Sequence, residues 1–133
     1  MNQEEHNLQC ACVKWFAYQH PELAGLLFAV PNGGARSKAT AGKLKAEGVV
    51  PGVADLILLV PFHMQGFDAF HALCIELKTK TGRQSPEQVE WQEKVRKKGY
   101  VYVVIRSLDD FIATVEGYLN KSGESPRPVG IHD

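Results

Sequence analysis

Two stretches decide the fold, GVVPGVADLILLV (residues 48–60) and CIELKTK (residues 74–80). Each holds a short apolar run that is typical of a buried strand, and we predict strands over residues 54–61 and about 70–78. A loop over Phe62–Asp68 would join them, and it is short enough for the second strand to return beside the first as a hairpin. Charged residues interrupt both apolar runs, so the function of the chain depends on why they are there.

The charged residues of the two predicted strands fall near the strand ends. Side chains alternate between the two faces of a strand, so Glu76 and Lys78 share one face. In a hairpin, Asp55 at the start of the first strand can lie opposite Glu76 at the end of the second. Two buried carboxylates close together repel each other. Either Lys78 neutralises one acid in an internal salt bridge while the other reaches solvent, or the two acids hold a divalent metal with Lys78 beside it.

The composition is that of an ordinary soluble domain. The 133 residues are 44% hydrophobic and 23% charged, and the formal net charge is zero. Basic residues gather over residues 36–45, 78–83 and 94–98, either as solvated helix surfaces or as one basic face for a polyanion. The cysteine spacing suits neither a disulfide nor a metal site, and neither a signal peptide nor an apolar run of membrane-spanning length is present. These features predict a reducing, cytoplasmic protein without a membrane span.

The remaining chain alternates helical and strand patterns. SPEQ (residues 85–88) is typical of a helix start, because Ser85 can cap the helix, Pro86 suits its first position and Gln88 can close a capping box. The continuous apolar run YVYVVI is typical of a central strand. We predict helices over residues 4–19, from about Arg36 to Gly48, from Ser85 to Gly99 and from Ser107 to about Asn120, and further strands over 26–30 and 100–105.

This order of elements predicts an α/β fold with a mixed β-sheet flanked by helices. We expect one domain over residues 1–120 and a flexible C-terminal tail over residues 121–133, because the final stretch lacks periodicity.

The charged triplet of the strands suits phosphodiester hydrolysis. Two carboxylates with several waters are a ligand set typical of Mg²⁺. A bound metal lowers the pKa of a water molecule, and an ammonium beside it, here Lys78, can stabilise negative charge in the transition state. Glu-x-Lys triplets are common by chance. A Glu-x-Lys triplet that lies on an apolar strand, one hairpin after an isolated aspartate, is much less common.

The stretches VADLILLV and ALCIELKTKTGRQSPEQVEWQEKVRKKGYVYVVIRSLDD resemble the VRR-NUC family of the PD-(D/E)xK nuclease superfamily. EEHNLQ resembles the opening helix of the family, and PNGG and LKAEGVVPGV resemble its next block, so the resemblance spans nearly the whole chain. Ala54 stands where the superfamily has a proline before the aspartate. The resemblance implies a restriction-endonuclease-like (PD-(D/E)xK) fold and a Mg²⁺-dependent nuclease, with Mn²⁺ as a substitute metal.

The resemblance also implies roles for individual residues. The implied catalytic residues are Asp55, Glu76, Lys78 and Gln88, and the implied metal ligands are Glu5, Asp55, Glu76 and the backbone carbonyl of Leu77.

Other roles stay open at this point. Helix angles do not distinguish Glu4 from Glu5, Gln88 is either a capping residue or turned toward the active site, and Gln9 lies one turn after Glu5. From the glycine loop and the basic segments we expect contacts to the nucleic-acid backbone by Asn32, Arg36, Lys38, Lys80 and Arg83.

The first hypothesis is therefore a Mg²⁺-dependent DNA endonuclease. It would be structure-selective or non-specific, similar to Holliday-junction resolvases, and would act on DNA as a homodimer in a bacterial or phage-infected cell. The alternatives are a DNA-binding module that has lost catalysis, a nuclease acting on RNA, and a structural protein with internal ion pairs. No recognition helix is identifiable, so the sequence preference stays open.

Overall fold

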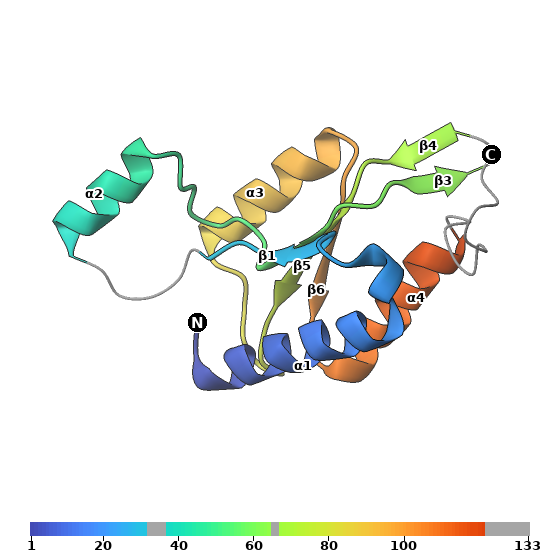
Figure 1. The fold of residues 1–133 in the computed structure, drawn as a ribbon. Coiled ribbons are helices and arrows are strands. Elements are labelled where there is room, and N and C mark those ends of the chain that lie inside the picture. Colours follow the sequence, from blue (N-terminus) through green and yellow to red (C-terminus); the bar gives the residue numbers. More distant parts are fainter. Residues whose placement is uncertain (32–36, 65–66, 122–133) are drawn as a thin grey trace.

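Helices cover both faces of one mixed four-stranded sheet (Figure 1). The computed structural model describes residues 1–31, 37–64 and 67–121. The predicted fold class, a mixed sheet flanked by helices, is confirmed. The elements in chain order are α1 (Gln3–Gln19), the 3₁₀ helix η1 (Pro21–Leu23), β1 (Leu27–Ala29), α2 (Lys38–Ala46), β2 (Leu56–Leu58), β3 (Phe62–Met64), β4 (Phe67–Phe70), β5 (Leu73–Leu77), α3 (Pro86–Lys97), β6 (Val101–Ile105) and α4 (Leu108–Lys121).

The two charged segments are neighbours in the sheet. The strand order is β1-β2-β5-β6, with β1 antiparallel to β2, β2 antiparallel to β5, and β5 parallel to β6. Leu56 of β2 lies opposite Ile75 of β5. One step further in this register places Asp55 opposite Glu76. The predicted return of the second strand beside the first, with the two acids opposed, is confirmed.

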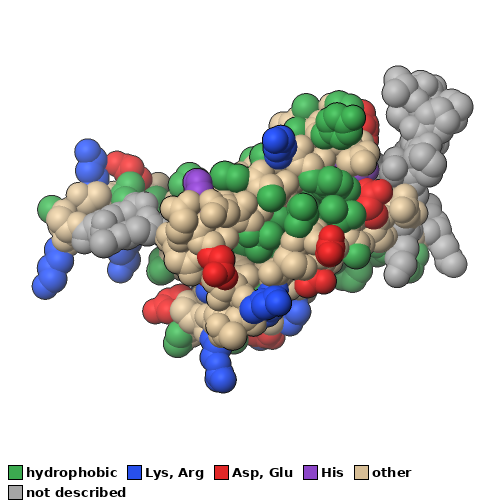
Figure 2. All heavy atoms as spheres, turned by 90° about the horizontal axis from the view of Figure 1, so that it is seen from below, with side chains coloured by type: hydrophobic (Ala, Val, Ile, Leu, Met, Phe, Trp, Pro, Cys, Tyr) green, Lys and Arg blue, Asp and Glu red, His purple; other side chains and the backbone are tan. Residues whose placement is uncertain are grey.

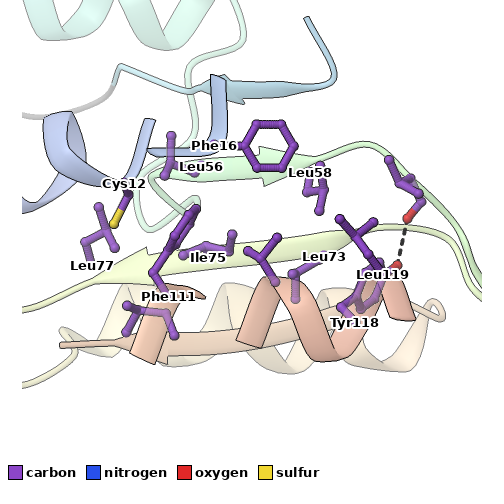
Figure 3. Close-up of a cluster of buried hydrophobic side chains, with 13 residues drawn as sticks. Cys12, Phe16, Leu56, Leu58, Leu73, Ile75, Leu77, Phe111, Tyr118 and Leu119 are labelled. Atoms are coloured by element: carbon purple, nitrogen blue, oxygen red, sulfur yellow. Dashed lines mark hydrogen bonds between the residues drawn. The ribbon is translucent and has the colours of Figure 1, made fainter. Parts of the chain in front are cut away.

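The main core lies on the face of the sheet that α1 and α4 cover. Leu56 of β2 and Ile75 and Leu77 of β5 are buried there against Phe16 of α1 and Phe111 of α4 (Figure 3). A slip of one residue between the strands would turn these apolar side chains to the other face. The core therefore fixes the register that opposes the acids.

The other face of the sheet carries Glu76 and is covered by α3. Cys74 and Tyr102 are buried on this face, where Trp91 and Val95 of α3 pack against them. The capping box predicted for the start of α3 is present. Helix α3 therefore begins over the charged end of β5, where its first turn contacts Glu76.

The loop predicted over residues 62–68 is wrong. This segment contains β3 and the start of β4, which pair with each other as a separate two-stranded sheet. Phe62 lies opposite Phe70, and the Phe62 ring centroid lies 5.3 Å from that of Tyr118 in α4. These aromatic contacts stabilise strands too short for hydrophobic periodicity to reveal.

Strand β6 lies at an edge of the sheet, not at its centre as predicted. Within the described residues its strand partner is β5 alone. The run is apolar because α3 and α4 pack against its two faces, where Tyr102 and Ile105 are buried. A continuous apolar run thus indicates burial on both faces and does not require a strand on each side.

The strands predicted over residues 54–61 and 70–78 were too long. Strands β2 and β5 occupy only part of these ranges.

Helix α2 stands apart from the sheet (Figure 1). It begins at Lys38, and the Ser37 side chain caps it by accepting a 3.1 Å hydrogen bond from the Thr40 N–H. None of its residues is buried. The predicted helix start at Arg36 lies outside the described residues.

The last helix begins after its predicted cap, Ser107, whose hydroxyl accepts a 3.1 Å hydrogen bond from the Asp110 N–H. It ends at Lys121, and residues 122–133 of the predicted tail lie outside the described residues. The domain boundary after residue 120 therefore stays a prediction. In the part of the chain that the structure describes, no helix has the length and apolarity needed to cross a membrane.

The loop before β2 approaches α3 most closely at Gly52. Its φ is +88°, and a β-carbon there would lie 2.4 Å from the carbonyl oxygen of Glu87. We predict that Gly52→Ala lowers the free energy of unfolding by roughly 2–4 kcal/mol, through backbone strain and this steric clash. Denaturant unfolding measures the change. The control is Gly25→Ala, at φ +86° with open space around it, which should lose only about 1 kcal/mol. Equal losses in the two variants would contradict the close approach.

Candidate active site

A cavity of about 600 Å³ lies where the start of β2 and the end of β5 meet the first turns of α1 and α3. All four predicted catalytic residues line it, which are Asp55, Glu76, Lys78 and Gln88. Its other lining residues are Met1, Glu5, Gln9, Ala29, Val30, Pro31, Pro51, Gly52, Ser85 and Glu87.

Asp55 and Glu76 meet at the junction of β2 and β5. The Leu77 N–H donates a 2.7 Å hydrogen bond to Asp55 Oδ2. The Glu76 side chain is only 2% exposed, and its Oε1 is buried without a hydrogen-bond partner among the described residues. The Leu77 backbone thus belongs to the site through its N–H group, and metal coordination by its carbonyl oxygen stays a prediction.

Lys78 lies beside Glu76 at the end of the same strand. Its Nζ is 3.8 Å from Glu76 Oε2, and its side chain is 12% exposed. This is a long ion pair, and one ammonium can neutralise at most one of two carboxylates. An internal salt bridge alone therefore leaves the pair of acids incompletely compensated.

Gln88 performs both of the roles that the sequence left as alternatives. Its Oε1 accepts a 2.8 Å hydrogen bond from the Ser85 N–H, and its own N–H donates to Ser85 Oγ at 3.2 Å, which completes the capping box. Its Nε2 donates a 2.8 Å hydrogen bond to Glu76 Oε2. One amide thus starts the helix and orients an acid of the cavity.

Burial and mutual repulsion make both acids difficult to ionise. The pKa of Glu76 is raised to about 8, first by burial and then by the charge of Asp55, which the Lys78 ammonium only partly opposes. Burial also raises the pKa of Asp55, against the lowering effect of its hydrogen bond from Leu77. A cation in the cavity would favour the ionised form of both acids.

Glu5, and not Glu4, belongs to the cavity. Glu5 is half-buried and lines it, whereas Glu4 is exposed. The charge of Glu5 contributes to the raised pKa of both Asp55 and Glu76. Among the described side chains, however, no three His, Cys, Asp or Glu are grouped closely enough to hold a metal ion. Glu5 therefore borders the cavity without completing a three-acid cluster.

The sequence and the fold correspond to a known domain. The model of the VRR-NUC domain family matches residues 1–109. The chain belongs to the VRR-NUC family. A solved structure named "VRR_NUC domain protein" is 27% identical, with a TM-score of 0.74, and the match covers 90% of this chain and 91% of that chain. No curated protein matches the sequence significantly. VRR-NUC domains are nuclease-type domains, so the function is of the nuclease type and the substrate is a nucleic acid.

The polar wall of this VRR-NUC cavity fits a divalent cation. Asp55 and Glu76 supply carboxylate oxygens, the donors that hard cations prefer. The buried Glu76 Oε1 is an acceptor to which no described residue donates. Because no third acid is grouped with these two among the described residues, a cation that keeps several waters, such as Mg²⁺, fits better than one that requires a full protein cage.

The predicted nucleic-acid contacts lie around the cavity of the VRR-NUC domain. Lys80 and Arg83 are exposed on the loop between β5 and α3, and Lys38 is exposed at the start of α2. Figure 2 shows basic side chains projecting from the lobe at its left, which α2 forms. None of these three lines the cavity, and Asn32 and Arg36 lie outside the described residues. Their contacts to a nucleic acid stay predictions.

Arg106, which holds the loop after Lys78, was not predicted from the sequence. Its Nη1 donates to three loop carbonyls, those of Thr79 and Gly82 at 2.7 Å and that of Lys80 at 3.3 Å. The parallel pairing of β5 with β6 brings Arg106 beside this loop. In the sequence, Arg106 is simply an arginine directly after an apolar strand. Its contact with the loop can be inferred only when the parallel pairing of β5 with β6 is known.

The raised pKa of Glu76 makes the stability of the metal-free protein depend on pH. An ordinary glutamate releases its proton near pH 4.5, whereas folded Glu76 keeps it up to about pH 8. Between these values the folded state binds more protons than the unfolded state, so the free energy of unfolding falls as pH rises. We expect a loss of roughly 2–4 kcal/mol over this interval, measured by denaturant unfolding in EDTA.

Glu76→Gln should abolish this loss, because glutamine does not ionise and its amide oxygen can still accept from Gln88. The control is Glu90→Gln, at a side chain that is 68% exposed, which should keep the wild-type profile. A wild-type stability that rises with pH over the same interval would contradict a raised pKa of Glu76.

Proposed function

We propose that this VRR-NUC domain is a Mg²⁺-dependent DNA endonuclease that hydrolyses phosphodiester bonds. The observation that carries the proposal is the pair of opposed acids, with one buried unpartnered oxygen, beside Lys78 in one cavity. Family membership supports a nuclease, and the donor set of the cavity supports a hard divalent cation.

Asp55 and Glu76 would hold the cation directly, with Glu5 and the Leu77 carbonyl as further oxygen ligands. The cation, Mg²⁺ or in its place Mn²⁺, would lower the pKa of a water molecule and offset negative charge on the scissile phosphate. The Leu77 N–H keeps Asp55 turned toward the cavity, and Gln88 fixes the orientation of Glu76.

Lys78 would act on the substrate side of the acids. Its ammonium is nearly buried and lies next to Glu76, so its charge is poorly screened by water. There it can orient the attacking water and stabilise the negative charge that develops on the phosphate in the transition state. Removal of one such group from a catalytic site typically costs about 10²–10³ in rate.

The substrate side of the proposal rests on the exposed basic residues. Lys38, Lys80 and Arg83, together with Asn32 and Arg36, would contact phosphates, which favours structure-selective or non-specific cleavage over base recognition. Two copies would act together, because each domain offers one such cavity and a duplex or a four-way junction has several strands to cut. The setting would be the cytoplasm of a bacterial or phage-infected cell.

A catalytically inactive DNA-binding module of the same fold is the main alternative. Its motivation is Ala54, which stands where the superfamily has proline. Ala54 is fully buried, and the neighbouring Asp55 still accepts its hydrogen bond from Leu77. The substitution therefore leaves the acid in position, which supports an active site.

The test is cleavage of linear duplex, flap, supercoiled plasmid and four-way junction DNA in Mg²⁺, Mn²⁺ or EDTA. We expect metal-dependent cutting by the wild type and a loss of about 100-fold or more in Lys78→Ala. Lys97→Ala removes an exposed cation at the far end of α3 from Gln88 and should cut like the wild type.

The other outcomes identify the alternatives. Metal-dependent binding without cutting of any DNA would establish the inactive module. If no DNA is cut, the same assay is run on RNA, and metal-dependent cutting there would replace the DNA substrate and leave the chemistry in place. Cutting that persists in EDTA, or in Lys78→Ala, would contradict the proposed mechanism.

A further inference from the structure

Gln9 presents a buried acceptor to the same cavity. It lies one helical turn after Glu5 on α1, on the same side of the helix, and both residues line the cavity. Its Oε1 is buried and has no hydrogen-bond partner among the described residues. Only one other side-chain atom of the described residues shares this condition, Glu76 Oε1, and Glu76 lines the same cavity.

Two unpartnered acceptors in one cavity indicate that something within it donates hydrogen bonds or carries positive charge. A buried acceptor without a donor destabilises the folded protein. No described residue donates a hydrogen bond to the Gln9 oxygen, and once a cation is bound the neighbouring acids Glu5, Asp55 and Glu76 are ionised and can only accept. The Lys78 ammonium contacts Glu76 instead. A molecule bound in the cavity can supply the donor that Gln9 lacks.

The chemistry of the cavity limits what that molecule can be. Water is the usual donor to an unpartnered acceptor in a polar cavity, and this one, at about 600 Å³, has ample room. A water molecule whose hydrogens are accepted by the wall turns its oxygen lone pairs away from the wall. Those lone pairs are then free to bind a cation, and Mg²⁺ normally keeps several waters of this kind.

We propose that Gln9 is a binding residue for the hydrated divalent cation. Its amide oxygen accepts a hydrogen bond from a water of the cation's hydration shell, while the acids bind the cation itself. This inference rests on the proposed metal site and adds to its charged ligands an uncharged amide, that of Gln9. It also accounts for the weak grouping of the acids, because a cation held partly through its waters does not require three adjacent carboxylates.

Gln9→Met tests the inference, because methionine has a similar length and shape but no strong acceptor. In EDTA, its melting temperature should equal or exceed that of the wild type, since a buried unpartnered oxygen has been removed. Its affinity for Mg²⁺ or Mn²⁺, measured by titration calorimetry without DNA, should be about tenfold weaker. The matched control is Gln19→Met, at an exposed position at the end of the same helix, which should change neither quantity.

Gln9→Glu provides the second variant. It keeps an acceptor oxygen at the same place but adds a negative charge beside three other acids. Its melting temperature in EDTA should fall, while its cation affinity should equal or exceed that of the wild type. A residue with a purely structural role would not show these opposite changes.

The following results would overturn the inference. Wild-type cation affinity in Gln9→Met would show that the amide does not serve the cation. A lower melting temperature of Gln9→Met in EDTA would assign the amide a structural role. If the wild type binds no cation, the metal site of the proposed function fails as well. A third variant, Asp55→Asn, separates the two proposals. If it abolishes cation binding while Gln9→Met leaves the affinity unchanged, the metal site stands and only the role of Gln9 is refuted.

Discussion

Two carboxyl groups held side by side at the junction of two buried strands, where both cannot easily ionise, are the constraint on which the rest of the structure depends. The side chains that alternate with Glu76 along β5 pack into the core under α1 and α4, and this packing fixes the register of β2 against β5. The same register sets Asp55 opposite Glu76. Repulsion between the acids cannot separate them unless the core is also disrupted. The apolar packing on one face of the sheet thus stabilises the register that keeps the two acids close together on the other face.

Polar groups in the wall of the cavity also have roles in the fold, which restricts how they can turn. Gln88 cannot turn away from Glu76 without also losing the hydrogen bond that caps α3. Gly52 lets the loop before Asp55 lie directly against the first turn of that helix. Groups fixed in this way need little rearrangement when charge develops in a reaction, which is the arrangement that electrostatic catalysis requires. Two buried oxygens without partners among the described residues, Gln9 Oε1 and Glu76 Oε1, are where the proposed cation and its waters would complete the site.

Much of this arrangement could be predicted from the sequence, since it depends on local signals. The short connection between the two apolar runs predicted the antiparallel pairing of β2 with β5, and alternation along the strand placed Glu76 and Lys78 on one face. The order of Ser85, Pro86 and Gln88 predicted the start of α3. These patterns follow from backbone geometry within a few residues, so a single sequence carries them.

The errors and omissions came from contacts between distant segments. The ribbon of β3 and β4 depends on the ring of Tyr118, which lies far along the chain. The edge position of β6 could not be deduced from its apolar run, because helices on both faces produce the same pattern as neighbouring strands. Glu4 and Glu5 flank the apolar stripe of α1 at similar angles, and only the packing of α1 against the sheet distinguishes them. Arg106 became recognisable only from the parallel pairing of β5 with β6.

The central claim is that the opposed acids form a cation site whose ionisation the protein resists until a cation binds. The most direct test is the number of protons released on binding of Mg²⁺ near pH 7, obtained by calorimetry in buffers of different ionisation enthalpy. With the pKa of Glu76 raised to about 8, the account predicts release of close to one proton by the wild type and none by Glu76→Gln. Binding without proton release, or no binding heat in any buffer, would contradict it.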